Sequence, residues 1–120
     1  MKQKLLIPLM GDNIAPRFDL STEAVIITSF DHDGIGNEEK MLVFSEGSAE
    51  KLCHLILTEG AKVVICGGIE EEYYRYLTWK KIKVFDSVIG SWKLATEHFR
   101  KGILKPGAIL DQKQLNKIIT

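Results

Sequence analysis

A chain of 120 residues, 45% hydrophobic and 27% charged, has the length of one globular domain and can bury its own core. No apolar run approaches the roughly 20 residues needed to cross a bilayer, and the first residues do not form a signal peptide, so we expect a cytoplasmic protein with no membrane partner. The 16 basic and 16 acidic side chains cancel, and a parallel sheet would interleave the acidic first half with the basic second half, so no nucleic-acid partner is predicted.

The chain begins with a predicted strand and a long loop. Residues 4–10 form an apolar run with Pro8 near its end, where one missing backbone donor is tolerable. Residues 12–21 contain turn formers and show no clear period, which is typical of a loop leaving the carboxyl end of the strand. Loops at this position often bind ligands.

A hairpin is predicted next. Residues 23–30 and 40–44 have the composition of strands, and the turn formers of 31–37 between them leave no room for a helix. This order indicates an antiparallel pair. His32, in the turn, is expected to be a solvated residue rather than a metal ligand.

The first helix follows a capping residue. Ser48 can cap it and Gly60 can end it. Its apolar positions recur at intervals of three and four and are expected to face the sheet: Ala49, Leu52, Cys53, Ile56 and Leu57. Cys53 is therefore expected to be a buried, unreactive thiol, and His54, off this stripe, a surface residue.

The most informative stretch is a short apolar run that ends in two glycines. Residues 62–66 are predicted to form an interior strand covered on both faces. Gly67 and Gly68 suit a sharp reversal and leave amide groups uncovered, while acidic residues at 70–72 favour a helix start. The residues of this helix expected to face the core are Tyr73, Tyr76, Leu77 and Trp79.

The last part of the chain predicts a parallel strand, a helix and a tail. Residues 82–85 follow a helix and should run parallel to 62–66. Ser91 can cap a helix over 92–100, whose buried side is expected to hold Leu94, Ala95, His98 and Phe99. We place the domain at 1–107 and a tail at 108–120, with enough apolar residues for a short helix that docks on the domain or on another copy. Deleting this tail should leave the domain folded.

Several segments in this order resemble the dinitrogenase iron-molybdenum cofactor biosynthesis family, over about residues 3–104. They are the loop Gly11-Asp12-Asn13-Ile14-Ala15-Pro16-Arg17-Phe18-Asp19, the stretch Val63-Val64-Ile65-Cys66-Gly67-Gly68-Ile69, and Ile82-Lys83-Val84-Phe85 followed by Leu94-Ala95 and Gly102. The resemblance implies a ribonuclease H-like three-layer α/β fold: a mixed sheet of about five strands, the first three antiparallel, with helices on both faces. The family includes carriers of iron-sulfur or molybdenum-iron-sulfur clusters in nitrogenase cofactor assembly, and this chain looks like its small stand-alone members.

Arg17 stands where the cluster carriers of that family have a histidine. A guanidinium cannot ligate iron, because it stays protonated and has no free lone pair. Arg17 can still bind an anionic cluster or a phosphate, with Phe18 as a pocket wall; a structural ion pair with Asp12 or Asp19 is at least as strong an alternative.

Cys66 is the candidate metal ligand. It ends the interior strand beside a helix N-terminus, a setting that favours the thiolate that binds metals. The alternative, which we favour, is a buried structural thiol.

These residues lead to a functional hypothesis with two alternatives. We expect a non-enzymatic carrier of an iron-sulfur or molybdenum-type metallocluster, or of another small anionic ligand. Its site is expected to comprise Asp12, Arg17, Phe18, Asp19, Gly67, Gly68 and Ile69. The first alternative is a regulatory module that binds a protein partner, or forms a homodimer, through the aromatic helix or the tail. The second is a ribonuclease H-type hydrolase, which would need several converging carboxylates.

Overall fold

The computed structural model describes residues 2–30 and 38–110 and shows an α/β protein built on one mixed sheet. The sheet has the order β4-β3-β1-β5-β6, with β2 paired to the end of β1. The strands of this sheet are β1 (Lys2–Met10), β2 (Asn13–Ile14), β3 (Glu23–Phe30), β4 (Glu38–Val43), β5 (Val63–Ile65) and β6 (Lys83–Phe85).

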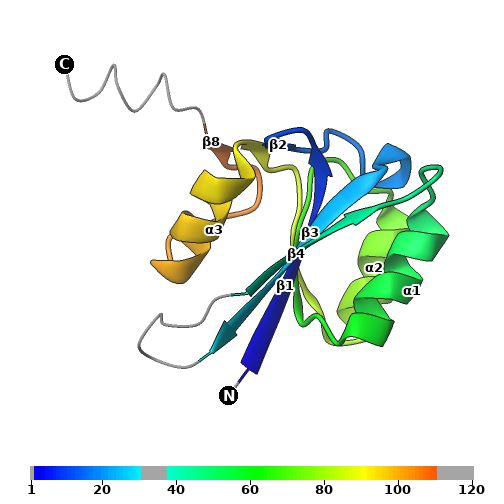
Figure 1. Cartoon of the computed structure of the whole chain (residues 1–120), viewed down its shortest axis with the longest axis horizontal. Helices are drawn as coiled ribbons and strands as arrows, with labels where there is room; N and C mark the ends of the chain where they lie inside the picture. Colours follow the sequence, from blue (N-terminus) through cyan, green and yellow to red (C-terminus); the bar gives the residue numbers. More distant parts are fainter. Residues whose placement is uncertain (1, 31–37, 111–120) are drawn as a thin grey trace.

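Three helices cover the two faces of the sheet (Figure 1). Helices α1 (Ala49–Glu59) and α2 (Glu71–Trp79) lie on one face, and α3 (Trp92–Arg100) lies on the other. A short 3-10 turn, η1 (Phe18–Leu20), lies in the loop after β2. The predicted α/β class, mixed sheet and helices on both faces are confirmed.

The predicted pairing of the strands is also confirmed. β5 lies between β1 and β6 and runs parallel to both, and β1, β3 and β4 are antiparallel neighbours. The segment 31–37, including His32, lies outside the described residues. β2 was not predicted, because a two-residue strand has no periodic pattern; it folds back on β1 with Leu9 opposite Ile14.

The helix ends follow the capping residues read from the sequence. The Ser48 hydroxyl accepts a hydrogen bond from the amide of Lys51 at 3.2 Å, and the Ser91 hydroxyl accepts one from Leu94 at 3.3 Å. Gly60 ends α1 with φ +72°, a conformation that glycine adopts without strain.

Each face of the sheet has its own core. Leu5, Ile7 and Leu9 of β1 point toward α3 and pack in one cluster with Trp92 and Ala95. Leu6 points to the opposite face, into a second cluster that includes Cys53 and Leu77, because side chains alternate along a strand. Leu94, His98 and Phe99, expected to be buried in α3, are half-buried.

Helix α2 buries fewer aromatic side chains than predicted. Leu77 is fully buried and Tyr73 is half-buried, but Tyr76 is 38% exposed and Trp79 is 73% exposed. The prediction that these two residues face the core is wrong. Helix α2 has nine residues and lies over the edge strand β6. It buries only one narrow row, formed by Tyr73 and Leu77, which are four positions apart, and Tyr76 and Trp79 lie off this row. Leu57 of α1, also expected inside, is 37% exposed.

A second, two-stranded sheet closes the end of the described chain. β7 (Ile89–Gly90) pairs in parallel with β8 (Ile109–Leu110), and Leu110 is buried in the core on the α3 side. The first residues of the predicted tail therefore pack on the body of the domain; residues 111–120 lie outside the described part of the chain.

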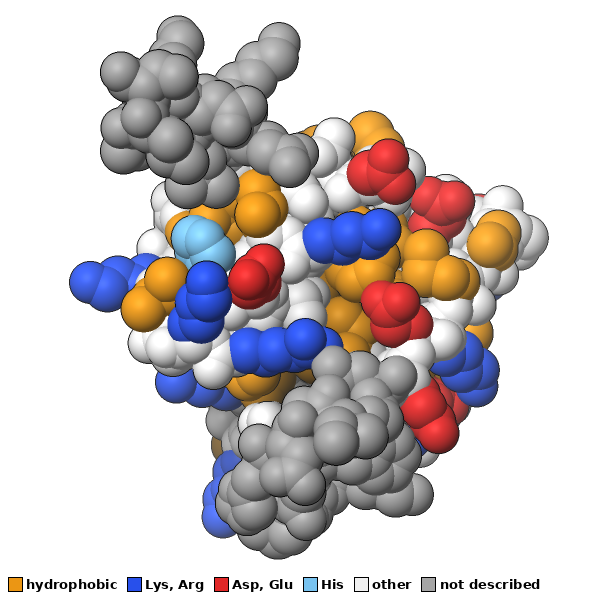
Figure 2. Space-filling model, turned by 60° about the vertical axis from the view of Figure 1, so that its left-hand side comes forward, with side chains coloured by type: hydrophobic (Ala, Val, Ile, Leu, Met, Phe, Trp, Pro, Cys, Tyr) orange, Lys and Arg blue, Asp and Glu red, His pale blue; other side chains and the backbone are white. Residues whose placement is uncertain are grey.

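The surface around α3 carries charges of both signs. Figure 2 shows Lys and Arg side chains interspersed with Asp and Glu, with hydrophobic side chains between them. No field of a single sign covers the described part of this face. Within residues 2–30 and 38–110, no helix has the length and apolar content needed to cross a bilayer.

Candidate functional site

The loop after β1 and the Gly67-Gly68 turn meet, as predicted, at the carboxyl ends of the parallel strands. Arg17 and Gly68 form a parallel β-bridge. The Phe18 amide donates to the Gly68 carbonyl at 2.8 Å, and the Gly68 amide donates to the Pro16 carbonyl at 2.7 Å. The two segments are thus joined directly by their backbones, so one of the amide groups expected to be available to an anion is already occupied.

The close contact explains the two glycines better than a special backbone conformation does. A Cβ atom on Gly67 would lie 2.4 Å from the Ala15 carbonyl oxygen and 2.6 Å from that of Pro16. Gly68 is less restricted, because its Cβ would be 3.3 Å from the Pro16 oxygen. Neither glycine has a positive φ, so the turn does not require a left-handed backbone at either position.

The guanidinium of Arg17 is held by Asp19. Its Nε lies 3.1 Å from Oδ1 and its Nη2 lies 2.6 Å from Oδ2, a bidentate pair. The Arg17 side chain is still 60% exposed. Of the two ion-pair partners considered, Asp19 is therefore the one in contact, and an anion that approaches Arg17 has to compete with the Asp19 carboxylate.

Phe18 anchors the loop. It is only 1% exposed and packs in the core on the α1 side, with its ring centroid 6.5 Å from that of Tyr73. Ile69, on the other side of the junction, is half-buried against the same core. Asp12 is exposed, and its carbonyl accepts a hydrogen bond from the amide of Trp92 at 3.3 Å. Phe18 thus fixes the junction in place and does not present an exposed ring.

Cys66 is enclosed in the core and is held as a neutral thiol. Burial raises its pKa to about 12, and the nearby carboxylate of Asp86 and the Cys53 thiol add to this effect. The expectation that the helix N-terminus favours the thiolate is wrong, because desolvation of the charge dominates. Within the described residues, no group of three or more His, Cys, Asp or Glu side chains is placed to hold a metal ion. These side chains do not fit a covalently ligated cluster.

The raised thiol pKa values predict a loss of stability in alkali. In the folded protein burial also raises the pKa of Cys53, to about 11, with a smaller contribution from Glu50, whereas the ordinary value is 9.0. The unfolded chain therefore releases these protons first, and the stabilisation is complete below pH 9 and is lost as the pH rises toward 12. From pH 8 to 10 each thiol should lower the unfolding free energy by about 1 kcal/mol.

Denaturant unfolding at several pH values measures this dependence. Cys66→Ala should show a shallower decline above pH 8 than the wild type, whatever its stability at pH 7. Parallel declines in the two proteins would contradict the assignment of a neutral, buried thiol.

A cavity of about 550 Å³ lies beside the junction. It is bounded by residues at the end of β1, in the following loop, and in the β7–β8 pair: Met10, Asn13, Ile14, Pro16, Ile89, Gly90, Ser91, Ile109 and Leu110. The sequence did not predict this cavity, because half of its wall comes from the β7–β8 pair. Its lining is apolar, with Asn13 and Ser91 as its polar side chains.

Comparisons with known proteins identify the fold and leave the family open. No family model matches the chain, and no curated protein matches it. Among solved structures, the chain is similar to PH0822, with 24% identity and a TM-score of 0.70 over 87% of this chain and 94% of that one. It is also similar to MJ0327 of Methanocaldococcus jannaschii, a candidate dinitrogenase, with 23% identity and a TM-score of 0.68 over 88% and 94% of the two chains.

A third similar structure is the apo form of the orange protein of Desulfovibrio gigas. It is 18% identical, with a TM-score of 0.68, over 87% of this chain and 92% of that one. At these identities the likeness establishes a shared α/β fold. The chain is therefore an α/β protein of this architecture, with loops and a cavity gathered at the carboxyl ends of its parallel strands.

Proposed function

We propose that this protein is a non-enzymatic carrier that binds a small anionic ligand, or an iron-sulfur or molybdenum-type metallocluster, at the carboxyl edge of its parallel strands. The main supporting observation is that backbone hydrogen bonds join the loop, at Pro16 and Phe18, to the turn, at Gly68, beside a cavity of about 550 Å³. Open α/β sheets usually bind ligands at this edge. The ribonuclease H-like assignment and membership of the cofactor biosynthesis family are part of this proposal.

Two of the structural neighbours favour a carrier. One is named as a candidate dinitrogenase, and another, the orange protein, was solved in an apo form, a term for a protein without a bound group. Fold likeness alone does not transfer an activity. It does make cargo binding the first hypothesis to test.

A cluster would be carried as cargo, through non-covalent contacts. The neutral thiol of Cys66 and the scattered acidic side chains do not form a ligand set in the described residues. The apolar cavity walls can contact a ligand. Arg17, which follows the wall residue Pro16 in the chain and does not itself line the cavity, has an exposed guanidinium that can supply positive charge. The amide groups of Gly67 and Ile69 donate to no backbone acceptor within the described residues and are further candidate donors to an anion.

Purification without oxygen tests the metal version directly. Elemental analysis and an absorption spectrum should show bound iron or molybdenum, or charge-transfer bands after reconstitution with iron and sulfide. A colourless protein that holds neither metal under both conditions would contradict the metallocluster proposal and leave only the small anion.

Substitutions in the Arg17–Asp19 pair should shift anion affinity in opposite directions. With molybdate as the probe, Arg17→Ala should weaken binding about tenfold to a hundredfold, because it removes a charge-assisted contact of about 1.5–3 kcal/mol. Asp19→Asn should strengthen binding several-fold, since it frees the guanidinium from a competing carboxylate. Calorimetric titration measures both effects.

Arg75 offers the matched control. It is also exposed and also paired, with Glu71 at 2.7 Å on α2. Arg75→Ala should leave molybdate affinity unchanged. Equal affinities for the wild type, Arg17→Ala and Asp19→Asn would mean that Arg17 is purely structural.

One observation favours a protein-interaction module as a second candidate. Three aromatic side chains of α2 are exposed: Tyr74 is 36%, Tyr76 is 38% and Trp79 is 73% exposed. Exposed aromatics are enriched at protein interfaces. If sedimentation analysis shows a stable complex that Trp79→Ala disrupts, this candidate gains over the carrier. Most of the tail at 108–120, the other expected route to a homodimer, lies outside the described residues.

The hydrolase alternative has less support. Asp12 and Asp19 have no third acidic partner in a shared cluster within the described residues, whereas two-metal chemistry needs several converging carboxylates. Magnesium-dependent cleavage of an RNA–DNA hybrid that is lost in Asp12→Asn would revive it.

A further inference from the structure

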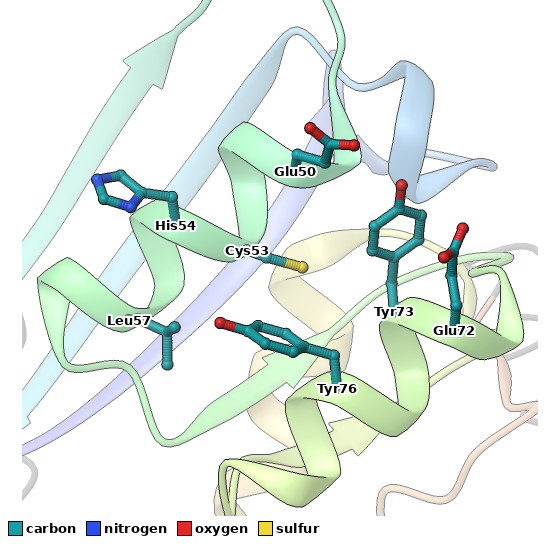
Figure 3. Close-up of a pocket in the computed structure, with 7 residues that line it drawn as sticks. All are labelled: Glu50, Cys53, His54, Leu57, Glu72, Tyr73 and Tyr76. Carbon is teal, nitrogen blue, oxygen red and sulfur yellow. The ribbon is translucent and has the colours of Figure 1, made fainter.

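A second cavity, of about 360 Å³, lies between α1 and α2, on the face of the sheet opposite α3 (Figure 3). Both helices contribute to its walls, which consist of Glu50, Cys53, His54, Leu57, Glu72, Tyr73 and Tyr76. Its volume falls within the range of small-molecule sites, roughly 300–1,000 Å³. Tyr73 also packs against Phe18 of the loop, with ring centroids 6.5 Å apart, but neither the loop nor the Gly67-Gly68 turn lines this cavity.

The interior of this cavity is apolar and aromatic. In Figure 3 the sulfur of Cys53 points into the space between the two helices, toward the rings of Tyr73 and Tyr76 on α2. Leu57 lies on the α1 side of the same space. Tyr76 is 38% and Leu57 is 37% exposed, so the cavity has both an apolar floor and an open mouth.

The charge at the mouth is negative. Glu50 and Glu72 line the cavity, and no Lys or Arg does. In the described part of the chain neither carboxylate has an ion-pair partner, in contrast to Glu71, which Arg75 holds at 2.7 Å. Burial raises the pKa of Tyr73, and the negative charges of Glu72, Glu50 and Glu70 raise it further. The negative potential that disfavours the ionised form of Tyr73 favours a bound cation.

We propose that the α1–α2 cavity binds a small organic cation: an ammonium group attached to a flat apolar body. The ammonium group lies near Glu50 and Glu72, where two carboxylates share one positive charge. The apolar body lies among Tyr73, Tyr76 and Leu57, where it makes hydrophobic and aromatic contacts. Tyr73, whose pKa burial and the two carboxylates raise, also offers its ring to the ammonium for a cation–π contact. This site is separate from the anion site proposed above and takes a ligand of the opposite charge.

Benzyltrimethylammonium is a suitable probe, with benzyl alcohol and phenylacetate as neutral and anionic controls. Calorimetry and amide chemical-shift mapping of the full chain should show binding of the cation, with shifts concentrated in α1 and α2. Benzyl alcohol should bind at least tenfold more weakly, and phenylacetate should not bind. The cation's affinity should fall as salt is added, because its charge is recognised near the surface.

Two carboxylate substitutions on adjacent residues give a matched comparison. Glu72→Gln should weaken binding at least fivefold, whereas Glu71→Gln, with the same charge change one residue away and outside the cavity wall, should stay within twofold of the wild type. Tyr76→Leu, at a partly exposed position, should weaken binding about as much as Glu72→Gln without unfolding the protein, which a thermal melt would check.

The proposal would be overturned by equal binding of phenylacetate, by equal losses in Glu72→Gln and Glu71→Gln, or by shifts mapped away from α1 and α2. Self-association could also fill the cavity. If raising the protein concentration alone shifts the same amides, the occupant is a second copy of the chain, and the small-cation proposal fails.

Discussion

Gly90→Ala is expected to lower the unfolding free energy by about 3–5 kcal/mol, because it separates β8 from the rest of the domain. Gly90 has φ +119°, which side-chain-bearing residues rarely adopt. A Cβ at this position would lie 1.8 Å from the carbonyl oxygen of Leu110. The backbone of β8 has to move away, and the buried side chain of Leu110 then loses its contacts in the core.

The loss expected for Gly90→Ala has two contributions, conformational strain and steric overlap, and Gly102→Ala separates them. Gly102 also has a positive φ, +72°, but a Cβ there would meet no atom within 4 Å. It should cost only the conformational strain of about 1–2 kcal/mol. Urea unfolding of both variants measures the difference, and equal losses would contradict a steric contact between Gly90 and β8.

Truncation tests the same contact without a substitution. A chain ending at 110 keeps β8, and a chain ending at 107 lacks it and exposes the space that Leu110 fills. The longer chain should melt at a higher temperature than the shorter one, although both should fold. Identical melts would mean that β8 adds no stability.

The arrangement of the main sheet could be predicted because its signals are local and strong. The apolar run within 62–66 indicates a strand covered on both faces, and the helix that follows requires a parallel crossover to 82–85; the structure has these strands at Val63–Ile65 and Lys83–Phe85. Ser48 and Ser91 mark helix starts by a hydrogen bond within four residues of sequence. Each of these features depends on neighbouring residues alone.

The features that could not be predicted depend on contacts between distant segments. The β7–β8 pair joins residues 20 positions apart through two-residue strands, too short for any period. The exposure of Tyr76 and Trp79 depends on how α2 sits over the edge strand β6, which helical spacing does not determine. In both cases tertiary packing decides the outcome.

The candidate site also has features that could be predicted from the sequence and features that depend on contacts between distant segments. Sequence order and the carboxyl-edge rule brought the loop and the glycine turn together correctly. The loop and the turn are joined by backbone hydrogen bonds. Such bonds involve no particular side chain, so they leave no pattern in the sequence. The partner of Arg17 was one of two residues considered, and only the geometry selects Asp19.

Gly67→Ala is the second substitution with a large expected effect, about 2–4 kcal/mol of unfolding free energy, comparable to other losses at closely packed positions. Its Cβ would lie 2.4 Å and 2.6 Å from the carbonyl oxygens of Ala15 and Pro16. Both atoms belong to the backbone, so the loop itself has to retreat. That movement breaks the hydrogen bonds that join the loop to Gly68 and draws Phe18 away from its place in the core.

Gly68→Ala is the control, because Gly68 lies in the same turn but has more room for a side chain. Its Cβ would approach only the Pro16 oxygen, at 3.3 Å, which a shift of a few tenths of an ångström relieves, so the loss should stay below about 1 kcal/mol. Denaturant unfolding gives both free energies, and hydrogen exchange at the Phe18 amide, which donates to the Gly68 carbonyl, reports whether the junction has opened. Protection of that amide should collapse in Gly67→Ala and persist in Gly68→Ala. The opposite order would mean that the close approach of loop and turn does not hold the site together.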